Sequence, residues 1–307
     1  MFKNIFYTMI FNNIARVAMI VGLAALTGFF SSCEKAVLDE TTGVEVADKN
    51  ANLIIRLKGS QVDDSFQRTR AMQNITDYCS RFNFVLYKDG QKVKGLSQKK
   101  GDADYGQVSM TLAAGTYKLL VLAHSSTGGN PTLSDPENIK FTNALGYTDT
   151  FYYYGDIEVT AEQKTHDVVL KRAVTRVFFV INDELPDDVA FIKYEFTGGS
   201  GVLNAVTGYG GSVNSRQEKY LDVSAAAAPV RSSLYTFLQE DTGAMQLTVT
   251  ALKSDKETEV KQLSFYDIPV EYGKETIVEG EFFDHYSDNN FSFQAETDWE
   301  TLQTISY

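Results

Sequence analysis

Beyond residue 50, apolar and polar residues alternate along most of the chain, a pattern typical of β-strands with one buried face. Phe82, Phe84 and Leu86 share one face of such a segment, and an Asp-Gly hairpin turn follows at Lys88–Gln91. The run from Met245 to Ala251 alternates apolar residues with Gln and Thr in the same way. Helical periodicity is nearly absent. The pattern therefore predicts an all-β fold of short antiparallel strands joined by Gly, Asp and Ser turns.

The chain is too long for a single sandwich. A β-sandwich domain has about 100 residues, whereas the 307-residue chain still has 275 residues when its first 32 are set aside. We predict two tandem antiparallel β-sandwiches, at residues 51–172 and 173–283. A weak internal repeat agrees with this division, because Thr165–Leu170 and Thr276–Val278 each follow a polar turn.

The first residues have the pattern of a targeting segment. The only charges in residues 1–32 are two basic ones, and the uncharged run Val17–Phe30 ends at the small residues Ser31 and Ser32. A bilayer-spanning helix needs about 20 residues, so this run is too short to cross a membrane. We predict that residues 1–32 are a secretory signal peptide and that residues 33–50 are a polar tether.

The end of this segment resembles a bacterial lipobox, in which cleavage leaves a lipid-modified cysteine as the first residue. Cys33 occupies that position, and acyl chains such as palmitate on it would hold the protein to the outer membrane. Each buried methylene contributes about 0.8 kcal/mol to such anchoring. Glu34, Asp39 and Glu40 resemble the signal that directs Bacteroidetes lipoproteins to the cell surface. The alternatives are an ordinary signal peptide with an incidental Cys33, or an uncleaved N-terminal helix.

Charge and composition exclude several classes of function. The chain has 28 Lys and Arg against 40 Asp and Glu, a formal charge of -12, which argues against nucleic acid as a partner. His124, His166 and His285 lie in separate segments and in no recognised catalytic motif, so we predict neither an enzyme nor a bound metal or other cofactor. We interpret His124 as a solvated strand end and Cys79 as a small buried apolar residue.

The most aromatic run of the chain is Phe151–Tyr154. Exposed aromatic faces can stack on sugar rings, so this run is one candidate carbohydrate platform. The alternative is a strand whose aromatic residues alternate between the core and a covered edge. The sequence leaves both interpretations open.

Four segments together resemble a known family. They are Arg81–Tyr87 before its Asp-Gly turn, Leu112–Leu119, Val169–Val177, and Ile268–Thr276 with Gly280–Phe283. In this order they resemble the FimB-like anchor and accessory subunits of the type V pili of Bacteroidales. The resemblance implies a cell-surface lipoprotein with two transthyretin-like β-sandwich domains in tandem.

The same resemblance implies a role in fimbrium assembly, with other fimbrial subunits as partners. Subunits of these pili join by strand exchange, in which an extended segment of one subunit pairs with an open sheet edge of its neighbour. We therefore expect an anchor or accessory subunit. The alternatives are a surface glycan-binding lipoprotein, or a tip adhesin of the same pilus type that binds a host glycan or protein.

Residues 284–307 contain the candidate exchange strand. A polar break at Asp284–Asn290 precedes the alternating residues Phe291, Phe293 and Ala295, and Trp299 follows them. An alternating strand after a polar break suits insertion into another subunit. It equally suits a last strand that pairs within its own domain, or a disordered end, and the sequence does not decide among these.

Overall fold

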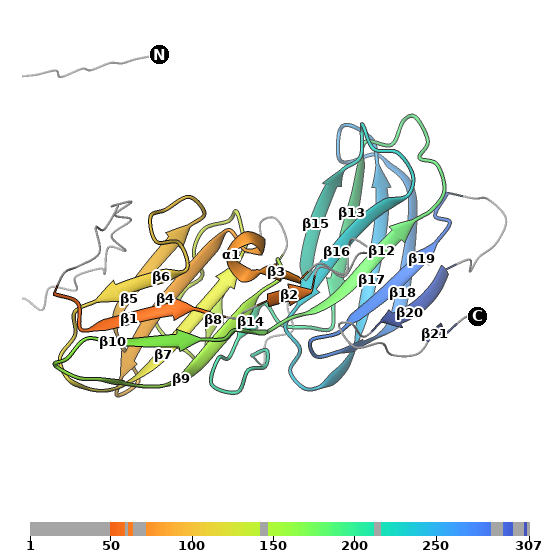
Figure 1. Ribbon diagram of the computed structural model, residues 1–307. Coiled ribbons are helices and arrows are strands. Elements are labelled where there is room, and N and C mark those ends of the chain that lie inside the picture. Colours follow the sequence, from red (N-terminus) through yellow and green to blue (C-terminus); the bar gives the residue numbers. More distant parts are fainter. Residues whose placement is uncertain are drawn as a thin grey trace, which may run out of the picture. The chain divides into compact units, whose positions relative to one another are not determined.

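The computed structural model describes residues 50–58, 61–63, 72–141, 147–211, 216–283, 291–296 and 304–305 (Figure 1). The predicted signal peptide, the lipidation site Cys33, most of the predicted tether and Trp299 lie outside these residues. No helix in the described ranges is long and apolar enough to cross a membrane.

The first sandwich has two sheets. Their strands, in spatial order, are β10 (Lys164–Val168), β1 (Leu53–Leu57) and β6 (Gln107–Met110) in one sheet, and β11 (Lys171–Arg172), β9 (Phe151–Val159), β7 (Gly115–His124), β4 (Arg81–Lys88) and β5 (Gln91–Lys99) in the other.

The second sandwich also has two sheets. Their strands, in spatial order, are β16 (Val230–Thr236), β12 (Thr175–Ile181), β19 (Glu275–Gly280), β20 (Phe291–Glu296) and β21 (Thr304–Ile305) in one sheet, and β15 (Gln217–Asp222), β13 (Phe191–Thr197), β17 (Thr242–Leu252) and β18 (Glu259–Glu271) in the other. The predicted all-β fold of two tandem sandwiches is confirmed.

The remaining elements are short. A two-stranded ribbon, a single helical turn and a small strand pair complete the described chain: β2 (Gln61–Asp63), β3 (Met72–Asn74), α1 (Ile75–Tyr78), β8 (Ile139–Lys140) and β14 (Val202–Leu203). β8 comes from the loop region of the first sandwich and pairs antiparallel with β14 of the second.

Both sandwiches share one strand order. If the seven main strands of each are numbered along the chain, both have one sheet in the order 4-1-7 and the other in the order 3-2-5-6. In each sandwich the first and last of these strands pair in parallel, β1 with β10 and β12 with β19, whereas the other main pairs are antiparallel. The weak repeat in the sequence lies on β10 and β19, which are the equivalent seventh strands.

Each sandwich has its own apolar core because its strands alternate. Phe82, Phe84 and Leu86 of β4 are buried in the core of the first sandwich. Val177 and Phe179 of β12 are buried in the core of the second.

A third cluster, which we call the seam, contains residues of both sandwiches. Its buried members are Val85, Tyr87, Leu120, Leu122, Leu133, Ile139, Tyr147, Tyr152, Ala173, Val174, Leu203, Ala205, Tyr235 and Phe237. Since the seam covers the second face of β4, that strand is buried on both sides from Phe82 to Tyr87.

Candidate functional site

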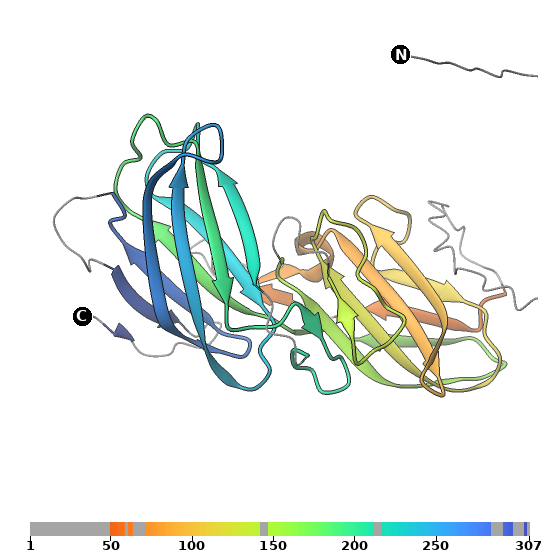
Figure 2. The same ribbon diagram turned by 180° about the vertical axis from the view of Figure 1, so that it is seen from behind.

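The predicted exchange strand lies at the edge of a sheet of the second sandwich. Phe291, Phe293 and Ala295 lie on β20, which pairs antiparallel with β19, so that Phe293 stands opposite Val278. β21 adds two further pairs on the outer side of β20. The darkest blue strands of Figure 2 are β20 and β21, at one edge of their sheet. In the single chain, the tail strand therefore pairs within its own sandwich.

In the first sandwich, the strand equivalent to β19 is β10. No described strand lies on its outer side. The N–H of Lys164 donates to the carbonyl of Asn52, and the carbonyl of Val168 accepts from the N–H of Lys58. Residues 164, 166 and 168 therefore turn their backbone groups toward β1. Because these groups alternate along a parallel strand, those of Thr165 and Asp167 face outward.

The side chains of this bare edge are mostly polar. Asp167 forms ion pairs with Arg56 at 2.7 Å and with Lys58 at 3.2 Å, and all three side chains are exposed. Charged side chains on an edge strand discourage indiscriminate strand pairing. The Nε2 atom of His166 is buried and has no hydrogen-bond partner among the described residues. Within the described ranges, no strand covers the outward backbone groups of β10, and charged side chains flank them.

A polar network surrounds the carboxylate of Asp149, which is 5% exposed. Nε and Nη2 of Arg172 donate to its two oxygens at 2.8 and 2.7 Å, and the hydroxyl of Tyr78 donates at 2.9 Å. Burial, and then the charge of Asp149, raises the pKa of Tyr78, so its hydroxyl stays protonated and remains a donor. The network fixes the side chain of Arg172, the last residue of β11, within the first sandwich.

A second ion pair is buried in the second sandwich. Arg176 of β12 pairs with Glu275 of β19, and their side chains are only 2% and 6% exposed. Burial opposes the charge of Arg176, but Glu275 and Tyr235 outweigh it and raise the pKa of the guanidinium. The guanidinium of Arg176 therefore stays charged within the protein.

His124 is buried, which corrects the interpretation that it is a solvated strand end. Its Nδ1 accepts from the N–H of Ser126 at 3.2 Å, so the neutral ring carries its proton on Nε2, 3.0 Å from Oδ1 of Asn83. Burial, with a smaller contribution from Arg81, lowers the pKa of His124 to about 4. The sequence did not indicate this burial, because the partner Asn83 is 41 residues away. His124 supports the fold of the first sandwich.

The other candidate chemical groups also serve packing. Cys79 is fully buried, and burial raises the pKa of its thiol, so it remains protonated as a small apolar residue. Phe151 lies in the first core and Tyr152 in the seam, whereas Tyr153 and Tyr154 are half-buried. The run therefore alternates between the core of the first sandwich and the seam. Among the described residues, no group of three His, Cys, Asp or Glu is placed to hold a metal ion.

Comparison with protein families gives one assignment. The model of a family of unknown function, DUF6562, matches residues 43–306, which includes both sandwiches and the tail strands. The chain belongs to the DUF6562 family. No curated protein matches this DUF6562 chain.

Several solved structures from Bacteroidales are similar to this DUF6562 protein. The fimbrial anchor protein Mfa2 from Porphyromonas gingivalis is 11% identical, with a TM-score of 0.42 over 80% of this chain and 96% of that one. A fimbrial assembly protein from Parabacteroides distasonis is 11% identical, with a TM-score of 0.42 over 82% and 97%.

A candidate adhesin from Bacteroides ovatus is 18% identical, with a TM-score of 0.46 over 71% of this chain and 84% of that chain. The sequence motifs resembled this same group of surface proteins. The resemblance of the DUF6562 chain to them is therefore confirmed, as a likeness and not as a function.

Proposed function

We propose that this DUF6562 protein is an anchor or accessory subunit of a fimbrium, held to the outer membrane by lipid on Cys33 and joined to a neighbouring subunit by strand exchange. The tail Phe291–Tyr307 is the exchange segment in this proposal. The sequence around Cys33 and the resemblance to FimB-like subunits motivate the anchor. The topology of the two sandwiches motivates the exchange.

The observation that carries the proposal is that β20 is a strand in excess of the shared fold. Each sandwich is formed by seven main strands in the same order, and the described residues of the first include no counterpart of β20. β20 is added beyond the seventh strand; it pairs along its whole length with β19 and at two residues with the short β21. A strand that the seven-stranded fold does not need can leave its sheet at a smaller cost than an internal strand.

Open edges that could receive such a strand exist on the same fold. Residues Thr165 and Asp167 of β10 present outward backbone groups, and the equivalent edge of β19 would be exposed if β20 departed. An added strand satisfies these N–H and C=O groups, and its alternate side chains provide selectivity. Proteins of similar structure include a fimbrial anchor and a fimbrial assembly protein, and the role in their names is the one that we propose here.

Two changes in the native bacterium test the two halves of the proposal. We expect Cys33→Ala to release the protein and its fibres into the medium, with the fold unchanged by circular dichroism. Thr41→Ala, in the same predicted tether, is the matched control and should leave fibres attached. Fibres that stay cell-bound in Cys33→Ala would contradict an anchor.

Deletion of Phe291–Tyr307 tests the exchange segment separately. We expect the truncated protein to remain folded and lipidated at the surface but to be absent from purified fibres. Immunogold labelling of the intact protein should mark fibre bases. Labelling at the opposite ends would favour a tip adhesin instead, and a truncated protein that still enters fibres would rule out the tail as the joining strand.

A further inference from the structure

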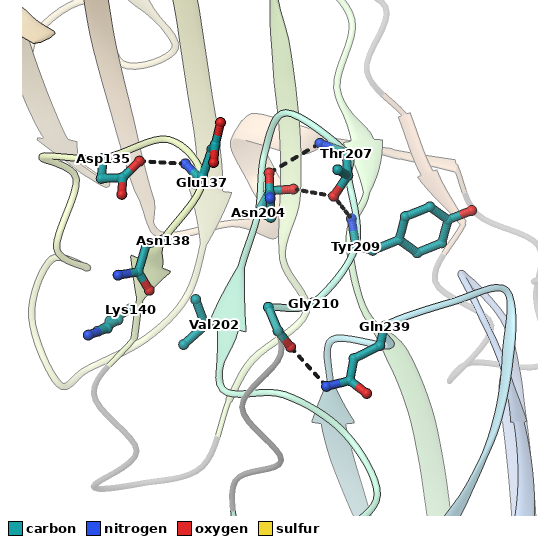
Figure 3. Close-up of a pocket in the computed structure, with 11 residues that line it drawn as sticks. Asp135, Glu137, Asn138, Lys140, Val202, Asn204, Thr207, Tyr209, Gly210 and Gln239 are labelled. Atoms are coloured by element: carbon teal, nitrogen blue, oxygen red, sulfur yellow. Dashed lines mark hydrogen bonds between the residues drawn. The ribbon is translucent and has the colours of Figure 1, made fainter. Parts of the chain in front are cut away.

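A polar hollow lies where β8 meets β14, and Figure 3 shows its lining. Its volume is about 730 Å³, which is in the range of small-molecule sites. One wall is the segment Asp135–Lys140. The other is formed by Val202 and the loop from Asn204 to Gly211, together with Gln239.

Hydrogen bonds hold both walls in place without using all of their polar groups. Oδ1 of Asn204 accepts the N–H groups of Val206 and Thr207 at 3.0 and 3.2 Å. Nε2 of Gln239 donates to the carbonyl of Gly211 at 3.0 Å. On the opposite wall, Oδ1 of Asp135 accepts the N–H of Glu137 at 2.9 Å. Walls fixed before a ligand arrives reduce the entropy lost on binding.

The wall from Asp135 to Lys140 presents several groups that the fold does not use. The side chains of Glu137, Asn138 and Lys140 are exposed, and no hydrogen bond or ion pair joins them to another described residue. They line the same wall in Figure 3. Carboxylates accept, the ammonium donates and the amide does both. This wall can therefore hydrogen-bond a ligand that is itself both donor and acceptor, as hydroxyl groups are.

Charge and polarity narrow the class of ligand. The lining includes two carboxylates, of Asp135 and Glu137, and one ammonium, that of Lys140, and the whole chain carries a charge of -12, so an anionic ligand is disfavoured. An apolar ligand would find little except the Val202 side chain.

Tyr209 is the aromatic residue at the hollow, and both its hydroxyl and its ring already contact other residues. The hydroxyl of Tyr209 donates to Asp241 at 2.6 Å, and its ring packs edge-on against Tyr272 with 5.2 Å between centroids. Figure 3 shows the Tyr209 ring directed away from Asn138 and Lys140. Recognition in this hollow would therefore depend on hydrogen bonds and not on aromatic stacking.

We infer that this hollow binds a neutral saccharide, with Glu137 and Asn138 hydrogen-bonded to its hydroxyl groups and Lys140 donating to its oxygens. The inference is independent of the proposed fimbrial role, because none of these residues lies on β10, β19 or β20. It also differs from the aromatic platform considered at Phe151–Tyr154, whose first two rings are buried.

An array of neutral oligosaccharides built from glucose, galactose, mannose and xylose tests this inference, with sialylated and sulfated counterparts of the same glycans included. We expect the purified full chain to bind at least one neutral series and to bind its anionic counterparts more weakly. The double change Glu137→Ala and Asn138→Ala should weaken that binding at least ~10-fold, because it removes one charged and one neutral hydrogen-bonding group. Both side chains are exposed, so the fold should be unaffected.

The matched control is Glu257→Gln, an exposed acidic residue in the turn between β17 and β18, and it should bind as the parent does. Failure to bind any neutral glycan would overturn the inference, as would equal binding by the double variant or a preference for the anionic series. Fibre attachment of the double variant should match the parent, so failure here is distinguishable from failure of the fimbrial proposal.

Discussion

The two sandwiches place the same kind of ion pair in opposite environments. In the first, Arg56 of β1 stands opposite Asp167 of β10, and in the second, Arg176 of β12 stands opposite Glu275 of β19. The first pair is exposed, with side chains 46% and 37% accessible, whereas the second is 2% and 6% accessible. The same cross-strand pair is therefore a solvated edge feature in one sandwich and a buried contact in the other.

The seam and the tail explain the difference. Arg176 contacts Tyr235, which belongs to the seam, and β19 carries β20 on its other side. β10 has no such cover in the described chain. The comparison shows that two sandwiches with one strand order can differ in which sheet edge is covered. Residues of the second sandwich pack against the first at the seam, and the second carries β20, whereas no described strand lies beyond β10 of the first.

Removing the buried member of this comparison should have the largest effect. Arg176→Ala leaves the Glu275 carboxylate buried without its partner, which is expected to lower the free energy of unfolding by about 3–5 kcal/mol. Chemical denaturation followed by circular dichroism measures this loss. A loss no larger than that of Arg56→Ala would contradict the claim that the two ion pairs lie in different environments.

Because it contains the buried His124, the first sandwich should lose stability at low pH. The pKa of His124 is lowered to about 4 in the fold by burial and by Arg81, whereas an unfolded histidine titrates near 6.5. Between these values the unfolded chain binds the proton and the folded chain does not, so stability falls as pH falls from about 6.5 toward 4. The loss attributable to His124 is up to roughly 3 kcal/mol.

Denaturation midpoints at pH 7 and pH 4.5 measure this loss. His124→Gln should reduce the difference between the two midpoints, whereas His166→Gln should leave most of it. An unchanged pH difference in His124→Gln would show that other groups cause it.

The smallest effect is expected at the exposed pair. Arg56→Ala removes a solvated partner of Asp167, which should cost about 0–1 kcal/mol and less at high salt. The same denaturation experiment at low and at high salt measures both quantities. A loss approaching that of Arg176→Ala would mean that β10 is covered in solution, against the open edge described above.

Alternation predicted most strands because one buried face imposes a period of two, as at Phe82, Phe84 and Leu86. The parallel pairing of the first and last main strands in each sandwich could not be predicted. In the first sandwich, for example, β1 and β10 are separated by more than 100 residues and pair through their backbones. The seam was also missed. Val85 and Tyr87 are buried by contacts that only the folded pair of sandwiches provides, and the same applies to the burial of Tyr152.

The tail shows how far the sequence alone can predict the candidate site. The spacing of Phe291, Phe293 and Ala295 predicted a strand, and β20 lies there. The spacing carries no information about which edge that strand prefers, since any open edge offers the same backbone groups. Its pairing with β19 in the single chain therefore came from the structure, and its pairing with another chain remains a proposal.

A disulfide lock across β19 and β20 tests the central claim, that β20 leaves its own sheet to join a neighbour. Glu279 and Ser292 stand opposite each other in the register, at a separation that antiparallel pairing makes suitable for a disulfide. We predict that the pair Glu279→Cys and Ser292→Cys keeps the protein out of fibres. Each single change, and the lock Thr248→Cys with Ser264→Cys across β17 and β18, should leave incorporation intact. Normal incorporation of the β19–β20 locked protein, with the disulfide verified by mass spectrometry, would contradict the account.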